Sequence, residues 1–218
     1  MQTINGLDIP TSLEELLDPR HVALLVYDMQ VGIARQIKER ESIVGQVQQV
    51  LRSARAAKVR TFFTRHMSLP RELMGSMQYR TAMAWQRKQD PAQVQSPFLR
   101  DSAGFGIIPE LQPIPSEAVF DKITMSAFEG TPLTIALRDC GVRAVVLVGI
   151  ALEVGIEPTA RHAADQGIVP ILVRDACGHG NAVAGERTLQ ALAFAGDSVI
   201  TEVSAIREIW AKHASELA

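Results

Sequence analysis

Short runs of consecutive apolar residues recur along the chain, and between them apolar residues recur every three or four positions. The runs lie at 21–28 (HVALLVYD), 59–66 (VRTFFTRH), 118–122 (AVFDK), 144–150 (AVVLVGI), 169–176 (VPILVRDA) and 198–203 (SVITEV). Such short runs are typical of buried strands, and helical spacing between them is typical of connecting helices. The pattern therefore predicts six strands that alternate with helices in a parallel sheet covered on both faces.

The segment 42–57 shows the clearest helical spacing. Its apolar face consists of Ile43, Val44, Val47, Val50, Leu51 and Ala54. Further helices are predicted at 131–141, at about 153–166, at 182–195 and from the last strand to the carboxy terminus. Near the amino terminus, Ser12 followed by Glu15 forms a capping-box pattern, which predicts a short helix. The whole arrangement is that of an α/β protein, a three-layer α/β/α sandwich with a Rossmann-like six-stranded parallel sheet.

Residues 67–115 break the alternation. They are rich in Met and Gln, with a stretch at 76–89 that has helical character, followed by a segment punctuated by Pro and Gly. We expect a long excursion over the active edge of the sheet, as in a lid. Its aromatic residues Trp85, Phe98 and Phe105 are expected either to line a pocket or to bury a subunit interface.

Composition narrows the class of protein. With 218 residues, 47% of them hydrophobic, the chain is predicted to form one domain spanning 1–218. The 22 basic and 24 acidic residues are spread along it, so we expect no nucleic-acid partner. No apolar stretch approaches a membrane span, which predicts a cytoplasmic protein without a membrane partner. Cys140 and Cys177 lie far apart, a spacing that fits neither a disulfide framework nor a metal site.

Candidate chemistry follows from the predicted sheet, because active sites in such sheets lie beyond the carboxyl ends of the strands. That rule selects Asp28, His66, Lys122, the turn at 149–155 and Asp175. Taken singly, each has a plain structural alternative: a helix N-cap for Asp28, a solvated strand end for Lys122 and a polar strand terminus for His66. Considered together, Asp28 and Lys122 favour a functional site, since opposite charges at one sheet edge neutralise each other and shift each other's pKa.

Three further acidic residues lie near the predicted edge. Glu153 and Glu157 are one helical turn apart, which usually indicates a solvated acidic face, although Glu153 falls in the first turn, close to the site. Asp175 is expected to be a structural cap or turn residue.

Three segments together resemble a known family. They are ALLVYDMQ at 23–30, VFDKITMSAFEGTPL at 119–133, and VLVGIALEVGIEPTARHAADQG at 146–167 followed by VPILVRDACG. Over roughly residues 20–203 they resemble the isochorismatase-like hydrolases, also called the cysteine hydrolase superfamily.

The resemblance implies roles for particular positions. Asp28 would be the general base, Lys122 its partner, and Gly155 would stand where cysteine members carry the attacking thiol, after a cis peptide bond at Ile150-Ala151. A glycine cannot form the acyl-enzyme of amide hydrolysis. The stretch TRHMSLP at 64–70 lacks the paired Asp and His of the metal-binding nicotinamidases, so neither a metal nor a cofactor is expected.

Isochorismatases proper also carry glycine at this position and cleave a vinyl ether without a covalent step. By this resemblance the protein is a hydrolase of a small, anionic metabolite, with Asp28 as the acid, Lys122 holding it and binding substrate carboxylates, and Gly155 leaving room for the substrate. Isochorismatases have glutamine where this chain has Arg65 and His66, so the pocket differs. The expected substrate-binding residues are His66, Trp85, Phe128, Ala151 and Glu153.

Two rival functions stay open. One is an amidase in which Glu153, or a water that it activates near Gly155, replaces the thiol. The other is a catalytically silent member that binds a small molecule or assembles as a structural oligomer. Members of the family are commonly dimers or tetramers, so a homodimer or homotetramer is expected.

Overall fold

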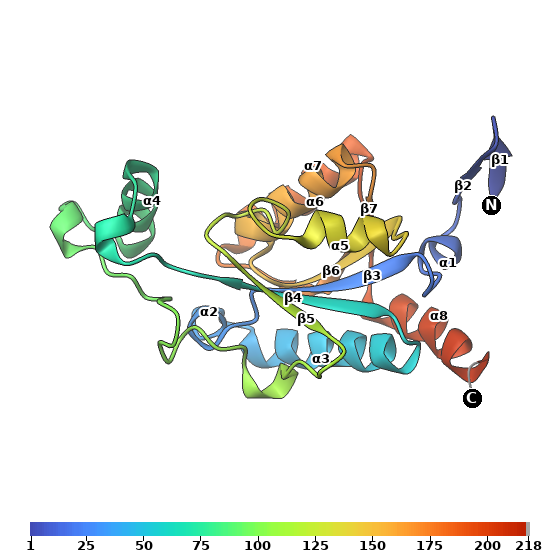
Figure 1. Cartoon of the computed structure of the whole chain (residues 1–218), viewed down its shortest axis with the longest axis horizontal. Coiled ribbons are helices and arrows are strands. Elements are labelled where there is room, and N and C mark those ends of the chain that lie inside the picture. The colour runs from blue at the N-terminus through green and yellow to red at the C-terminus, as the bar shows by residue number, and fades with distance from the viewer. Residues whose placement is uncertain (217–218) are drawn as a thin grey trace.

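A six-stranded parallel sheet forms the centre of the computed structural model, which describes residues 1–216 (Figure 1). Its strands are β3 (Val22–Tyr27), β4 (Arg60–His66), β5 (Ala118–Lys122), β6 (Ala144–Ile150), β7 (Val169–Gly178) and β8 (Val199–Thr201). Their order is β5-β4-β3-β6-β7-β8, and every neighbouring pair is parallel. The predicted α/β fold and its six strands are confirmed.

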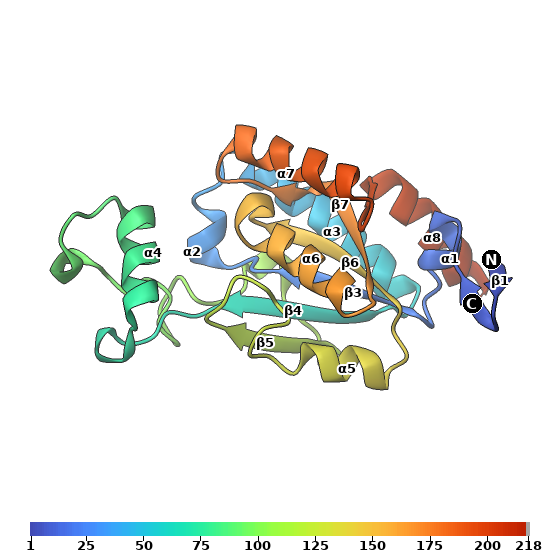
Figure 2. The same cartoon turned by 90° about the horizontal axis from the view of Figure 1, so that it is seen from above.

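Helices cover both faces of this sheet (Figures 1 and 2). On one face lie α3 (Arg40–Ala56) and α8 (Val203–Glu216); on the other lie α5 (Leu133–Asp139), α6 (Glu157–Asp165) and α7 (Ala182–Ala195). All six residues of the apolar face predicted for 42–57 are buried. Among residues 1–216 no helix is both long and apolar enough to cross a membrane.

The central strands β3 and β6 are buried along their whole length. Successive side chains of a strand point to opposite faces. In β3, Leu24 and Val26 therefore join the core under α3 and α8, whereas Leu25 and Tyr27 join the core under α5, α6 and α7. This alternation sends the last side chain of β3 toward the α6 side of the sheet.

Some short elements were not predicted. Strands β1 (Gln2–Ile4) and β2 (Leu7–Ile9) form an exposed antiparallel hairpin ahead of α1 (Leu13–Leu16), and α2 (Val31–Ala34) follows β3. The hairpin turns at Asn5 and Gly6, both with positive φ, and Asn-Gly is a strong hairpin signal. The predicted capping box at Ser12 and Glu15 is present.

The helix predicted from about residue 153 does not begin as an α-helix. Residues Leu152–Ile156 form a π-helical turn, and α6 starts only at Glu157. Pro158 has no N–H to donate, so it fits the first turn of α6, where backbone N–H groups lack helical partners. The turn after β6 is therefore wider than helical spacing suggests.

The excursion leaves the sheet at the carboxyl end of β4. It holds α4 (Ser76–Gln86) and three short 3₁₀ helices, η1 (Arg71–Leu73), η2 (Pro91–Gln93) and η3 (Pro109–Leu111). In both views α4 stands outward from the edge of the sheet (Figures 1 and 2). Trp85 is 53% exposed, whereas Phe105 is buried. The buried Gln30 side chain bonds the backbone of His66, just before the excursion, and of Phe105 within it, and so ties both points to the end of β3.

A buried carboxylate fixes the start of β5. Glu117 precedes the strand, its side chain is 3% exposed, and it accepts two hydrogen bonds from Arg55 of α3, each 2.8 Å long. It also accepts the N–H of Ile114 at 2.9 Å. These bonds hold β5, and with it Lys122, against the rest of the molecule.

We therefore expect Glu117→Gln to destabilise the protein by about 2–3 kcal/mol, because hydrogen bonds to a buried charged group are worth more than neutral ones. Urea denaturation measures the difference. Lys212→Gln is the matched control, since it breaks the pair with Glu14, whose two side chains are 55% and 60% exposed, and should leave the midpoint almost unchanged. Equal effects from the two variants would contradict this account of β5.

Candidate active site

The carboxyl ends of four neighbouring strands meet at one edge of the sheet. Asp28 follows β3, His66 ends β4, Lys122 ends β5, and Ala151 follows β6. His66 and Lys122 are register partners. Asp28 has a φ of 46°, in the left-handed region that few residues other than glycine adopt. The four positions selected from the sequence are thus brought together.

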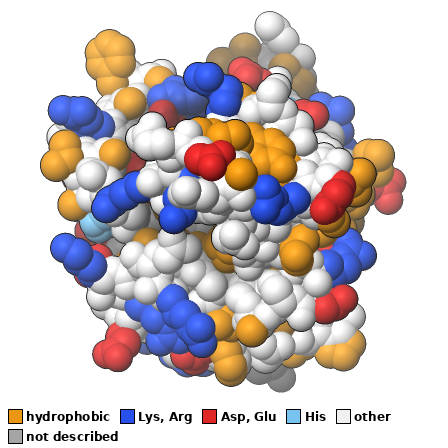
Figure 3. Space-filling model, turned by 90° about the vertical axis from the view of Figure 1, so that its left-hand side faces the viewer, with side chains coloured by type: hydrophobic (Ala, Val, Ile, Leu, Met, Phe, Trp, Pro, Cys, Tyr) orange, Lys and Arg blue, Asp and Glu red, His pale blue; other side chains and the backbone are white. Residues whose placement is uncertain are grey.

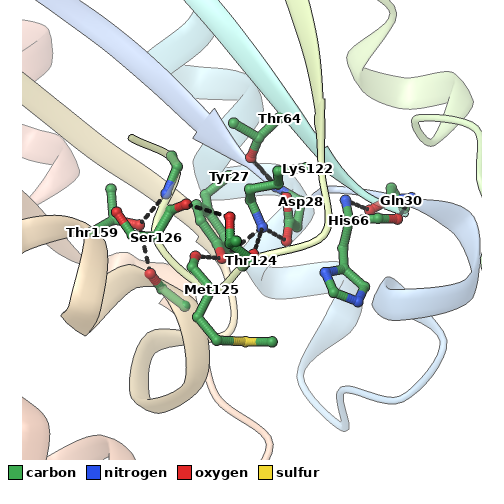
Figure 4. A network of polar contacts seen from close by, with 12 residues as sticks. Tyr27, Asp28, Gln30, Thr64, His66, Lys122, Thr124, Met125, Ser126 and Thr159 are labelled. Atoms are coloured by element: carbon green, nitrogen blue, oxygen red, sulfur yellow. Dashed lines mark hydrogen bonds and ion pairs between the residues drawn. The ribbon is translucent and has the colours of Figure 1, made fainter. Parts of the chain in front are cut away.

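Asp28 and Lys122 form the ion pair that the sequence predicts. Lys122 Nζ lies 2.7 Å from Asp28 Oδ2, and the two side chains are 0% and 5% exposed, respectively (Figure 4). Thr64 of β4 donates its hydroxyl to Asp28 Oδ1 at 2.7 Å. Each carboxylate oxygen therefore has a fixed partner, and the charge of Asp28 is held in one orientation.

Lys122 donates to three acceptors. Besides Asp28, its Nζ contacts the Tyr27 hydroxyl at 2.8 Å and the Thr124 carbonyl at 3.2 Å. An ammonium has three protons, so all of them are in use. If Lys122 binds a substrate carboxylate, as expected from the sequence, the incoming anion must therefore displace one of these acceptors. The bond to Thr124 is the longest of the three.

Burial governs the proton equilibria of the site. It lowers the pKa of Lys122, against the opposing effect of Asp28. It raises the pKa of Tyr27 well above the usual value, and the neighbouring Asp28 adds to that effect. Burial and the Lys122 charge lower the pKa of His66, so the imidazole is neutral at pH 7. The neutral groups Tyr27 and His66 therefore flank the Asp28–Lys122 pair.

Tyr27 occupies the direction in which a side chain at position 155 would point, whereas the sequence led us to expect room for a substrate there. A Cβ built on Gly155 would overlap the Tyr27 hydroxyl. The Gly155 N–H donates to the Ala151 carbonyl at 3.0 Å. The peptide bond between Ile150 and Ala151 is cis, as the resemblance implied.

The two glutamates do not form a solvated acidic face, so that interpretation was wrong. Glu153 Oε1 accepts the N–H groups of Gly180 and Asn181 at 2.8 and 2.7 Å, just before α7. Glu157 Oε2 accepts the hydroxyl of Thr188 in α7 at 2.7 Å. Its other oxygen, Oε1, pairs with Arg161. Both carboxylates tie the turn after β6 to α7. Glu153 Oε2 is buried without a hydrogen-bond partner among the described residues.

The aromatic candidates divide into two groups. His66 makes edge contacts with Trp85 and Phe98 at centroid distances of 6.4 and 6.0 Å, so these two excursion residues do reach the site. Phe128 is buried in the apolar core under α5 and α6, where its ring lies 5.6 Å from that of His162. Figure 4 shows Tyr27 and His66 on opposite sides of the Asp28–Lys122 pair.

Neither cysteine occupies the position of an attacking nucleophile at this edge of the sheet. Cys177 is inside β7, and its Sγ donates to the Leu147 carbonyl at 3.5 Å. Burial raises the pKa of its thiol to about 12. Cys140 follows α5 and is exposed. Asp175 accepts the Val203 N–H at the start of α8, which confirms its structural role.

Two participants in the site were missed from the sequence, Tyr27 and Thr64. Thr64 is a buried polar residue in an otherwise apolar part of β4, two positions before His66 and on the same face of the sheet. A fully buried hydroxyl in such a strand requires a partner. That requirement was the available signal for Thr64.

Surface charge adds little selectivity. Figure 3 shows the end of the molecule at which α4 lies, and there basic and acidic side chains are interspersed. Among residues 1–216 no group of three or more His, Cys, Asp or Glu side chains is placed to hold a metal ion.

A family model for the isochorismatase domain matches residues 22–203, which covers every strand of the large sheet and the catalytic candidates. The chain belongs to the isochorismatase family. It is an isochorismatase-like hydrolase, and similar solved structures share its α/β fold. The family model does not settle which bond this hydrolase cleaves.

Sequence relatives include ureidoacrylate amidohydrolase RutB from Rhizobium rhizogenes, 26% identical over 179 residues that make up 75% of this chain and 72% of the relative. Similar solved structures include a cysteine hydrolase from Pseudomonas syringae pv. phaseolicola, with a TM-score of 0.75 and 22% identity, covering 89% of this chain and 94% of that one. An isochorismatase family protein from Burkholderia thailandensis has a TM-score of 0.72 and 24% identity, covering 88% and 96%. At these identities the solved structures show the fold alone.

The two thiols predict a simple labelling pattern. Iodoacetamide should modify the native protein once, at Cys140, because only a thiolate reacts and the buried Cys177 has a pKa of about 12. Intact mass spectrometry at pH 8 counts the adducts, and a second adduct should appear only in denaturant. Rapid labelling of native Cys177 would show that this thiol is accessible and reactive.

Proposed function

We propose that this protein hydrolyses a small, anionic metabolite by proton transfer through Asp28, without a covalent thioester intermediate. The observation that carries the proposal is the buried Asp28–Lys122 pair, with Thr64 as its third member, at the junction of four strand ends. A buried charge pair costs desolvation energy and is a poor source of stability. Its location at the edge where α/β enzymes bind ligands favours a functional explanation.

Cleavage of a vinyl ether fits these groups. The reaction needs a proton delivered to the vinyl carbon, stabilisation of the oxocarbenium ion that results, and water to capture it. In this proposal the Lys122 ammonium passes a proton to Asp28 across their 2.7 Å contact, Asp28 delivers it to the vinyl carbon, and the conjugate carboxylate stabilises the cation. The proton that the capturing water loses returns to Lys122, which holds the carboxylate in place throughout. An acidic group of the substrate would replace the Thr124 carbonyl, which accepts a hydrogen bond from Lys122 Nζ at 3.2 Å.

Amide hydrolysis is the second candidate, and the similarity to ureidoacrylate amidohydrolase RutB favours it. With glycine at 155 and both cysteines elsewhere, the attacking group would be water, activated by Asp28 or by Glu153. Glu153 Oε1 is already engaged by two N–H groups, so only Oε2 is left for that role. A third candidate is a binder without activity, which predicts affinity for the same compounds without turnover.

The direct experiment is an assay of the purified protein on small carboxylated vinyl ethers and on small amides, with product followed in each case. Asp28→Asn keeps the size of the side chain but removes the carboxylate that accepts and delivers the proton. It should lower kcat/KM by at least about 10²-fold, the effect typical of general acid–base catalysis. Far-ultraviolet circular dichroism checks that the variant is folded.

Asp139→Asn, on the exposed end of α5, is the control and should retain full activity. Turnover of vinyl ethers supports the first candidate, and turnover of amides alone supports the second. Binding without turnover on every compound overturns the proposed activity, and so does an Asp28→Asn variant with unchanged kinetics.

Lys122→Ala removes both the partner of Asp28 and a cation near the substrate. We expect a higher KM together with a lower kcat. We also expect the protein to lose about 3–5 kcal/mol of stability, because a buried carboxylate is left unpaired. Kinetics below the melting temperature and urea denaturation measure the two effects. A normal rate with an unchanged KM would remove Lys122 from the site.

A further inference from the structure

The ring of Tyr27 occupies the volume that a side chain at position 155 would need. A Cβ built on Gly155 would overlap the Oη and Cζ atoms of Tyr27 and lie 2.6 Å from Cε1, closer than Cβ atoms come to other heavy atoms. Tyr27 is 2% exposed, and its hydroxyl is bound by Lys122 and by the Met125 carbonyl. The ring cannot move aside without breaking these bonds.

A second glycine fixes the backbone of the same residue. Gly149 is the register partner of Tyr27 in the β3–β6 pair, with a φ of 124°, and a Cβ there would overlap the Tyr27 carbonyl oxygen. The two strands therefore approach closely at this point. Tyr27 is packed against Gly149 through its backbone and against Gly155 through its ring.

The hydroxyl of Tyr27 is a neutral group in this environment. Burial and the charge of Asp28 disfavour the phenolate. A neutral hydroxyl donates to Met125 and accepts from Lys122, which matches the two bonds observed. Tyr27 is therefore not an attacking group, and its bond to Lys122 fixes one of the three ammonium protons.

We propose that Tyr27 is the positioning residue of this site, with its ring in the space of a residue-155 side chain and its hydroxyl orienting Lys122 toward Asp28. Tyr27 and Gly155 then form a matched pair, and a thiol at 155 would have to displace the Tyr27 ring. The orienting role rests on the proposed function of the Asp28–Lys122 pair, whereas the steric pairing stands without it.

The steric pairing is tested by thermal unfolding of a set of variants. Gly155→Ala and Gly155→Cys should lower the Tm by roughly 3–9 °C through overpacking. Combined with Tyr27→Leu, which removes the atoms that overlap, each should produce no further loss and a Tm at or above that of Tyr27→Leu alone. Combined with Tyr27→Phe, which keeps the ring, the loss should persist. Gly45→Ala, inside α3 with open space around its Cβ, is the control and should not lower the Tm.

If a Gly155 variant is insoluble, recovery of soluble protein in the Tyr27→Leu background supports the pairing in the same way. Gly155→Ala with a Tm equal to that of the parent overturns it. Additive losses in the double variants, or insolubility that Tyr27→Leu does not relieve, overturn it as well.

The orienting role is tested without substrate, by NMR of the protein labelled with ¹⁵N-lysine. The buried Lys122 ammonium should give a resonance with cross-peaks to the Tyr27 ring, because its three protons are hydrogen-bonded. Tyr27→Phe removes one acceptor, which disfavours the charged form, so the resonance should titrate at a lower pH. An unchanged titration overturns the orienting role.

A later assay separates this inference from the proposed activity. With any substrate found, Tyr27→Phe should lower kcat and shift the alkaline limb of the pH–rate profile to lower pH. A protein that turns over no compound, yet shows the Tm and NMR results above, would contradict the activity and support the pairing. An active protein that lacks the Tm and NMR results would support the activity and contradict the pairing.

Discussion

The geometry of the site depends on one buried charge pair. Asp28 and Lys122 are removed from water at the junction of four strands, and each is bound by neutral groups as well as by its partner. Either charge left without its partner in this position would destabilise the fold by about 3–5 kcal/mol. The order of the strands, the left-handed turn at Asp28 and the rigid start of β5 all bring these two side chains within contact.

Neutral neighbours decide what the pair can do. Thr64 donates to one oxygen of Asp28, while Tyr27 and Thr124 accept two of the three Lys122 protons. The remaining lone pairs of Asp28 are therefore the groups in the site most available to a substrate. Proton transfer therefore centres on the carboxylate. The lysine maintains the orientation and charge of that carboxylate, and it responds to an anion only by giving up a bond.

Periodicity was enough to predict the sheet, its helices and the edge at which the charged residues meet, because burial repeats along every strand and helix. It failed where the backbone departs from regular geometry. The π-helical turn at 152–156 places Glu153 against the segment before α7, whereas α-helical spacing had placed it beside Glu157 on a solvated face. The contact between Tyr27 and Gly155 joins residues 128 positions apart in the sequence, and no local pattern reports it.

The attachment of the excursion determines how far this segment can vary. One buried side chain, Gln30, bonds the backbone at two points, at His66 just before the excursion and at Phe105 within it. The loop is therefore closed at its base by the rigid sheet, and closure entropy grows only slowly with loop length. Insertions, deletions or whole replacements between these anchor points would leave the ion pair in place. The excursion can thus change in length and sequence without disturbing the ion pair at its base.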